Sequence, residues 1–402
     1  MTTLRRWLLK THPLIQSTLI SFLFIIFFNC LTAKVQPSAQ VQSPYIVPKS
    51  KEKSSFVTLV AGIDPEGTDP LSSRTSFLGY LLHLLVVRYV LDITNSSSDL
   101  NVLIRFRKLA ETPRALTEAQ ENFFETLRMK LFYLPTEIKY DSPGYMMDKF
   151  YILRLQKYKQ ILFFDADVLP LCNWDFYFKL MDEGYLAPNL ALAYMHEPAQ
   201  GGFFIVTPEI GDWEKYRALR FLDLEQGFGT SLRHPAESLK GNYTTWSWQA
   251  ASVDQGMLYH WVRYVKKSTS LAIGNRLQAW ESGDDGNLKL VKDLRHYSLA
   301  CPNHIDIASE KWISRFPIYM DHIHYTGSKK PWQRSNFDLD CVHDNVSIEH
   351  DRFTIWRFLL RKAWDKYDLG SLQSLFPKVN GSVAEDIHKL ERFFSKPFCK
   401  YT

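Results

Sequence analysis

The sequence predicts an α/β domain with a largely parallel sheet, a helical C-terminal part and a membrane anchor. Between residues 56 and 206, short runs of β-branched and aromatic residues alternate with stretches of helical periodicity. Such alternation is typical of α/β domains. Beyond residue 344 only the helical spacing persists, and a long uncharged segment precedes residue 34.

Each strand is expected where a short apolar run lies between polar turns. The stretch 225–250 is rich in Gly, Ser, Pro and Trp and is expected to be a long surface loop. Residues 55–344 are expected to form the main domain and residues 345–402 a helical extension. The predicted strands are 56–60, 100–106, 128–134, 160–164, 190–194 and 203–206, and the predicted helices are 77–90, 149–158, 353–364 and 387–394.

Composition indicates a globular protein that does not bind nucleic acid. Of 402 residues, 46% are hydrophobic and 23% charged, which are ordinary globular values. The net charge is +5, and the first 33 residues supply +3, which leaves about +2 for the remainder. No stripe of Lys and Arg follows, so the footprint of nucleic-acid binding is missing from the sequence.

Residues 14–33 form an uncharged apolar segment of 20 residues. At about 1.5 Å per residue, such a helix spans the roughly 30 Å hydrocarbon core of a bilayer. Arg5, Arg6 and Lys10 precede it, and positive flanks stay cytosolic. The pattern predicts a cytosolic tail (1–13) and a single-pass type II anchor. A cleaved signal peptide ending near Ala33 is the alternative.

Features beyond the anchor favour the lumen of the secretory pathway, in the Golgi or endoplasmic reticulum. Residues 34–54 contain three prolines among Gln, Ser and Lys and are expected to be a flexible stem. Four cysteines outside the anchor allow up to two disulfides, and their spacing matches no zinc site. These cysteines are Cys172, Cys301, Cys341 and Cys399, and four glycosylation acceptors are Asn95, Asn242, Asn345 and Asn380.

Two carboxylates follow the most apolar predicted strand, as Asp165 and Asp167 come directly after Ile161–Phe164. Alternate residues of a strand point to one side, and ligands of open α/β sheets bind where strands end. Paired carboxylates attract hard divalent cations such as Mg²⁺ or Mn²⁺, which bridge proteins to diphosphates. The alternative is that one Asp caps the turn and the other is solvated.

Three further blocks combine residue types that suit a phosphorylated ligand. The segment from His324 to Trp332 contains an imidazole, a glycine and two lysines. Lysine is a natural phosphate partner, and glycine lets the backbone approach a ligand closely. The other two blocks are Gln200-Gly201-Gly202 and Asp254-Gln255-Gly256.

Together these blocks resemble the glycogenin-like glycosyltransferases of family 8 over roughly residues 56–335. That family has a lysine-bearing helix before a strand ending in D-A-D, as Lys149 precedes Asp165-Ala166-Asp167 here. Its H-x-x-G-x-x-K-P-W block matches residues 324–332, and its D-Q-G matches residues 254–256.

The resemblance implies a GT-A fold, a Rossmann-like mixed sheet flanked by helices, and a UDP-sugar donor transferred with retention of configuration. It implies Mn²⁺, or Mg²⁺, held by Asp165, Asp167 and His324. A front-face attack and a covalent intermediate both remain open. The implied nucleotide-sugar contacts are Asp165, Ala166, Asp167, Gln200, Gly201, Gly327 and Lys330, and the implied catalytic residues are Lys149, Asp254 and Gln255.

The chain departs from the family at two places. Gln200-Gly201-Gly202 stands where Asn-Ser/Ala-Gly is frequent, and Ala61-Gly62-Ile63-Asp64 replaces a polar-aromatic loop. No residue matches the self-glucosylating tyrosine of glycogenin, so cytosolic glycogen priming is not expected. The acceptor is expected to be a glycan, a lipid or a protein.

Two rival interpretations stay open. A haloacid dehalogenase-like phosphatase also places D-x-D after an apolar strand, and Gly283–Gly286 could imitate its late acidic motif. Leu169 stands where that class has Thr or Val. The second rival is a catalytically inactive membrane protein that binds sugar nucleotides.

Overall fold

The computed structural model describes most of the compact unit Ser50–Thr402. The predicted tail, the anchor and nearly all of the stem lie outside the described residues, as do Gly283–Gly286 and almost all of the predicted loop 225–250. No helix in the described part of the chain is long and apolar enough to cross a membrane. The described ranges are 53–64, 66–107, 115–134, 144–193, 199–226, 254–268, 270–273, 278–282, 288–293, 321–338, 342–343 and 352–399.

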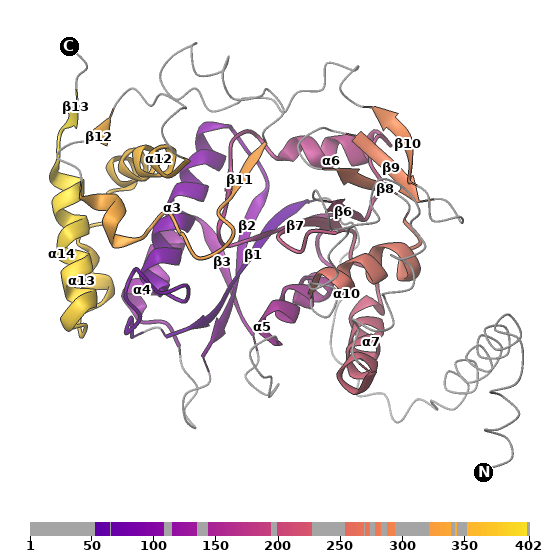
Figure 1. The fold of residues 1–402 in the computed structure, drawn as a ribbon, viewed down its shortest axis with the longest axis horizontal. Helices are drawn as coiled ribbons and strands as arrows, with labels where there is room; N and C mark the ends of the chain where they lie inside the picture. The colour runs from indigo at the N-terminus through magenta and orange to yellow at the C-terminus, as the bar shows by residue number, and fades with distance from the viewer. Residues whose placement is uncertain are drawn as a thin grey trace, which may run out of the picture. The chain divides into compact units, whose positions relative to one another are not determined.

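A nine-stranded sheet with the order β10-β9-β8-β6-β7-β4-β1-β2-β3 forms the centre of the fold (Figure 1). All six predicted strands are confirmed. The three strands at one end were not expected, because their sequences are short and mix polar with apolar residues. The strands are β1 (Ser55–Ile63), β2 (Asp99–Phe106), β3 (Met129–Tyr133), β4 (Ile161–Asp165), β6 (Leu190–Ala193), β7 (Phe203–Val206), β8 (Ser270–Ile273), β9 (Gln278–Ser282) and β10 (Leu288–Asp293).

The sheet is mixed, which confirms what the family resemblance implied, whereas the largely parallel sheet expected from the alternation of strands and helices was wrong. Strands β4, β1, β2 and β3 are parallel. Strand β7 runs antiparallel to both β4 and β6, and β9 runs antiparallel to both β8 and β10. Only nine residues separate β6 from β7. A parallel connection needs a crossover of a dozen or more residues, so a short link favours antiparallel pairing.

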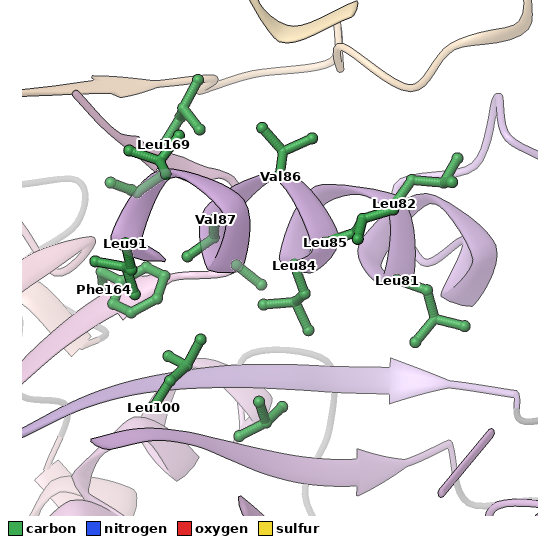
Figure 2. Packing of buried hydrophobic residues seen from close by; sticks show 14 of the residues in the cluster. Leu81, Leu82, Leu84, Leu85, Val86, Val87, Leu91, Leu100, Phe164 and Leu169 are labelled. Atoms are coloured by element: carbon green, nitrogen blue, oxygen red, sulfur yellow. The ribbon is translucent and has the colours of Figure 1, made fainter. Parts of the chain in front are cut away.

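Helix α3 (Phe77–Ile93) packs between the sheet and a short strand, β5 (Val168–Pro170). Ser76 caps its first turn by accepting a hydrogen bond from the Gly79 amide. Figure 2 shows Leu84 directed toward the sheet strand that carries Leu100, whereas Leu169 of β5 lies over the opposite side of the helix. Burial of both faces explains why most residues of α3 are apolar.

Of the remaining helices of the main domain, only one was predicted, at residues 149–158, and its form differs from the prediction. The expected helix at 149–158 is instead a short α-helix followed by a 3₁₀-helix that ends at Arg154. A two-stranded antiparallel ribbon joins β5 to β11 (His322–His324). The other helices are α4 (Glu118–Thr126), α5 (Gly144–Met147), α6 (Asp175–Asp182), α7 (Asp212–Gln226) and α10 (Asp254–His260), which a π-helical segment (Trp261–Val265) extends.

The helical C-terminal part is confirmed as helices, which belong to the same hydrophobic core as α3. Trp356 and Leu390 are fully buried there. Asp386 accepts a hydrogen bond from the Leu71 amide at 2.9 Å and forms an ion pair with Arg334. The C-terminal elements are α12 (Arg352–Tyr367), α13 (Leu372–Leu375), α14 (Gly381–Ser395) and the paired β12 (Val342–His343) and β13 (Phe398–Cys399).

Candidate functional site

Two carboxylates lie at the carboxyl end of the interior strand β4, which ends at Asp165. Its four apolar residues are fully buried, and the chain emerges at Asp165. The Asp165 amide donates to the carbonyl oxygen of Gly202 at 2.8 Å, which continues the β4–β7 pairing to the site. Ala166 is buried in the turn that follows. Asp165 keeps 34% of its side chain exposed and Asp167 14%, so the pair is open on one side.

The β5–β11 ribbon brings His324 to these carboxylates. His324 pairs in register with Val168, the residue after Asp167, and the Tyr325 amide donates to the Asp167 carbonyl at 3.0 Å. The Nε2 atom of His324 lies 3.2 Å from Asp167 Oδ1 and 4.0 Å from Asp165 Oδ2. One ligand atom from each of the three residues lies within 4.8 Å of the others. Two carboxylates and an imidazole fit a divalent cation.

The two carboxyl groups have pKa values shifted in opposite directions. Burial raises the pKa of Asp165, and the charge of Asp167 adds to the rise although Lys149 opposes it. Burial also opposes ionisation of Asp167, but His324 and Lys330 outweigh it and hold the pKa of that carboxyl below its usual range. The pair therefore resists a second negative charge, and a bound cation would favour both ionised forms.

Each carboxylate of the pair has a lysine partner. Lys330 forms an ion pair with Asp167 Oδ2 and donates to the Tyr325 carbonyl at 2.7 Å. Lys149 lies 3.2 Å from Asp165 Oδ1 and forms an ion pair with Asp254. Burial would lower the pKa of Lys149, but Asp165 and Asp254 outweigh it and raise that pKa. The Lys149 ammonium group therefore stays charged.

Gly201 and Gly202 are required by close contacts. A Cβ atom on Gly201 would lie 2.0 Å from Asp254 Oδ2 and 3.2 Å from Lys149 Nζ. A Cβ atom on Gly202 would lie 2.4 Å from His324 Cε1. The backbone at residues 201–202 therefore lies against Lys149 and Asp254 on the one hand and against His324 on the other. Only residues without a side chain allow this close approach.

Gln200 contacts the proposed metal-binding histidine, with its side-chain amide nitrogen 2.9 Å from His324 Nδ1. When a histidine binds a metal through one ring nitrogen, the other donates its hydrogen to a nearby acceptor. If Nε2 bound a cation, Nδ1 would carry the hydrogen, and the Gln200 amide oxygen could accept it once the side-chain amide had rotated by about 180°. In that case Gln200 would orient His324.

We expect Gln200→Ala to weaken Mn²⁺ binding about 10-fold while the fold survives, because orienting partners of ligands contribute about that much. Calorimetric titration of Mn²⁺ measures the effect. Gln200→Glu, which keeps an acceptor oxygen, is the matched control and should bind Mn²⁺ more tightly than Gln200→Ala. Equal affinity in the Gln200→Ala and wild-type proteins would refute this role.

The other predicted residues lie at or near this centre. Asp254 begins α10 and is buried against Lys149, and Gln255 is half-buried in the same first turn. Gly327 is exposed and has φ of +83°, a conformation that favours glycine.

Sequence reasoning missed two polar residues on α3. Burial raises the pKa of Tyr80, and the charges of Asp167 and Asp165 add to the rise. His83 is fully buried three residues further on. The sequence shows both as polar residues within a mainly apolar helix, but it does not indicate which residues they contact.

No family model and no curated protein matches the sequence. The chain is similar to solved structures of three glycosyltransferases. The bifunctional WbbM (apo structure) is 11% identical, with a TM-score of 0.39, over 84% of this chain and 56% of that one. GlyE from Streptococcus pneumoniae TIGR4 is 12% identical, with a TM-score of 0.34, over 79% and 64%.

The galactosyltransferase LgtC, solved with donor and acceptor sugar analogues, is 12% identical, with a TM-score of 0.35, over 78% of this chain and 99% of that one. The chain thus spans just over half of WbbM and less than two thirds of GlyE.

Proposed function

We propose that this protein is a metal-dependent glycosyltransferase of the GT-A fold and family 8 type, which transfers a hexose from a UDP-sugar. The observation that carries the proposal is the convergence of Asp165, Asp167 and His324 between two buried lysines. A cation between two carboxylates, next to a lysine, is an arrangement suited to a diphosphate.

In this proposal Asp165, Asp167 and His324 hold Mn²⁺ or Mg²⁺. A divalent cation bound there supplies Lewis-acid stabilisation of the charge that develops on the departing UDP. Lys330 donates to Asp167 and to the Tyr325 carbonyl, so a diphosphate on a cation held by Asp167 would lie within reach of its ammonium group. By turning to the phosphate oxygens it would stabilise the same charge, and Gly327 would let the backbone approach them.

Lys149, Asp254 and Gln255 are proposed to face the donor sugar. Lys149 fixes the carboxylate of Asp254 by an ion pair, and its hydrogen bond to the Gly201 carbonyl at 2.8 Å fixes the loop that passes beside it. Asp254 or Gln255 would then stabilise an oxocarbenium-like centre. Retention of configuration follows by front-face attack or through a covalent intermediate.

The proposed location is the lumen of the Golgi or endoplasmic reticulum, with residues 14–33 as a type II anchor. Its support is the uncharged segment behind Arg5, Arg6 and Lys10, and the four glycosylation acceptors. Cys172 is disulfide-bonded, which agrees with an oxidising compartment. The acceptor would be a glycan, a lipid or a protein that passes through this compartment.

Lys330→Ala is expected to weaken donor use by about 10² to 10³-fold in kcat/KM, since loss of one charge-stabilising donor has that effect. Steady-state kinetics with the preferred UDP-sugar measure it. Lys329→Ala is the matched control, because Lys329 is the neighbouring lysine but is exposed. An unchanged rate and KM in Lys330→Ala would remove its diphosphate role.

The proposal is tested by incubating the full chain, in detergent, with a panel of UDP-sugars and Mn²⁺. Release of UDP from at least one donor, abolished by EDTA and restored by Mn²⁺, is the expected result. Hydrolysis of a generic phosphomonoester without donor turnover would favour the phosphatase interpretation. UDP binding without turnover would favour the inactive protein.

A further inference from the structure

His83 is a polar side chain in the apolar core that the proposed reaction does not use. It lies on α3 with no exposed surface. Its Nε2 atom is 3.1 Å from the carbonyl oxygen of Val168, and Trp356 of α12 donates its indole N–H to His83 Nδ1 at 3.0 Å. Both ring nitrogens therefore have partners from other parts of the chain.

The direction of these hydrogen bonds follows from the partners. An indole N–H can only donate, so Nδ1 of His83 carries no hydrogen and Nε2 carries one. That hydrogen is donated to the Val168 carbonyl. Burial lowers the pKa of His83 to about 4, so the ring is neutral near pH 7. The result is a directed chain from Trp356 through His83 to the Val168 carbonyl.

Aromatic rings also fix the plane of the His83 ring. Its plane lies within 10° of the Trp356 ring, as the in-plane hydrogen bond between them requires, and it meets Tyr325 and Trp332 edge to face. Gly79, one turn earlier, admits the Trp332 ring, because a Cβ atom there would lie 2.3 Å from it. The ring of His83 therefore cannot rotate without moving three large side chains.

Val168 connects the hydrogen bonds of His83 and Trp356 to the candidate metal site. It follows Asp167 directly and is the register partner of His324. The ribbon has only three residue pairs, so its own pairing fixes its position weakly. A displacement of the Val168 backbone would move Asp167 and His324, whose ligand atoms are 3.2 Å apart.

We propose that His83 is a positioning residue for the metal centre. It holds the β5–β11 ribbon in place by its hydrogen bond to the Val168 carbonyl, and the hydrogen bond from Trp356 fixes the tautomer and orientation of its ring. The inference rests on the proposed function, since it assumes a cation on Asp165, Asp167 and His324. It makes α12 of the C-terminal part a support of the metal site, although α12 contributes no ligand.

The test measures the Mn²⁺ dissociation constant of the full chain by calorimetry, together with its thermal unfolding. His83→Phe keeps a ring but removes both hydrogen bonds, and Trp356→Phe removes the indole donor together with part of the buried ring volume. His83→Gln retains an N–H for Val168. Leu84→Ala is the matched control on the same helix, because Leu84 is buried and directed toward the sheet (Figure 2).

We expect His83→Phe to raise the Mn²⁺ dissociation constant about 10-fold, within the range for partners outside the ligand set. Trp356→Phe should raise it less, and His83→Gln should restore most of the affinity. Leu84→Ala should lower the unfolding temperature without changing the dissociation constant. If His83→Phe does not fold, the Mn²⁺ dissociation constants of Trp356→Phe and Leu84→Ala are compared instead. A higher value in Trp356→Phe alone supports the inference, and equal values contradict it.

Two outcomes overturn the inference in distinguishable ways. If Asp167→Asn loses Mn²⁺ binding but the His83 and Trp356 variants keep wild-type affinity, His83 is only a core residue and the proposed function survives. If wild-type protein binds Mn²⁺ no better than Asp167→Asn does, the metal site fails and the inference fails with it.

Discussion

Asp167→Asn is expected to abolish transfer and metal dependence together while the fold survives. The amide keeps the size of the carboxylate but loses the charge that attracts a cation, and Lys330 loses its ion-pair partner. Charge stabilisation by a metal contributes several kcal/mol, and about 4 kcal/mol corresponds to roughly 10³-fold in rate. Donor turnover measured against Mn²⁺ concentration gives the effect.

Asp182→Asn is the matched control for this substitution. Asp182 is an exposed acid at the end of α6 that pairs with Lys159, away from the site. This variant should keep wild-type turnover and metal dependence, since exposed ion pairs contribute little. Near-normal, Mn²⁺-dependent activity in Asp167→Asn would contradict the metal assignment.

Gly202→Ala is expected to reduce turnover about 100-fold, since a displacement of 1 Å at a reacting centre can have that effect. The new Cβ atom would lie 2.4 Å from His324 Cε1 and 3.0 Å from Asp165 Oδ2. Neither group can retreat easily, because Gln200 contacts the imidazole and Lys149 contacts the carboxylate. Turnover and Mn²⁺ affinity should therefore fall together.

Gly184→Ala separates this steric effect from a general effect of replacing glycine. Gly184 has φ of +73°, so alanine is strained there, but a Cβ atom would meet nothing within 4 Å. It should lower thermal stability and leave turnover unchanged. Wild-type turnover in Gly202→Ala would show that the loop moves aside and that the contact is not restrictive.

The sequence predicted those parts of the fold whose residues carry a strong local signal. The four buried apolar residues of β4 and the long apolar helix α3 were found within a few residues. Strands β8 and β9 were not, because they are short and have no clear alternation. Strand–helix alternation alone gave the wrong direction for β7, although the short link between β6 and β7 favours antiparallel pairing.

Residue types in the site were predictable, but their contacts were not. Asp165 and His324 lie 159 residues apart, and only the β5–β11 ribbon places them together. The steric role of Gly202 and the contact of Gln200 with His324 require the fold. His83 and Trp356, 273 residues apart, show the same limit. A buried histidine in an apolar helix is visible in a sequence, but its partners are not.

In the proposed enzyme, Asp165, Asp167 and His324 bind a divalent cation that recruits a nucleotide diphosphate. Anomalous diffraction from crystals of the protein grown with Mn²⁺ and UDP tests it most directly. One Mn²⁺ peak is expected in contact with all three side chains and with the diphosphate, and Lys330 is expected to have turned from Asp167 to the phosphate. UDP bound without a peak at these residues, with Lys330 still on Asp167, would contradict it.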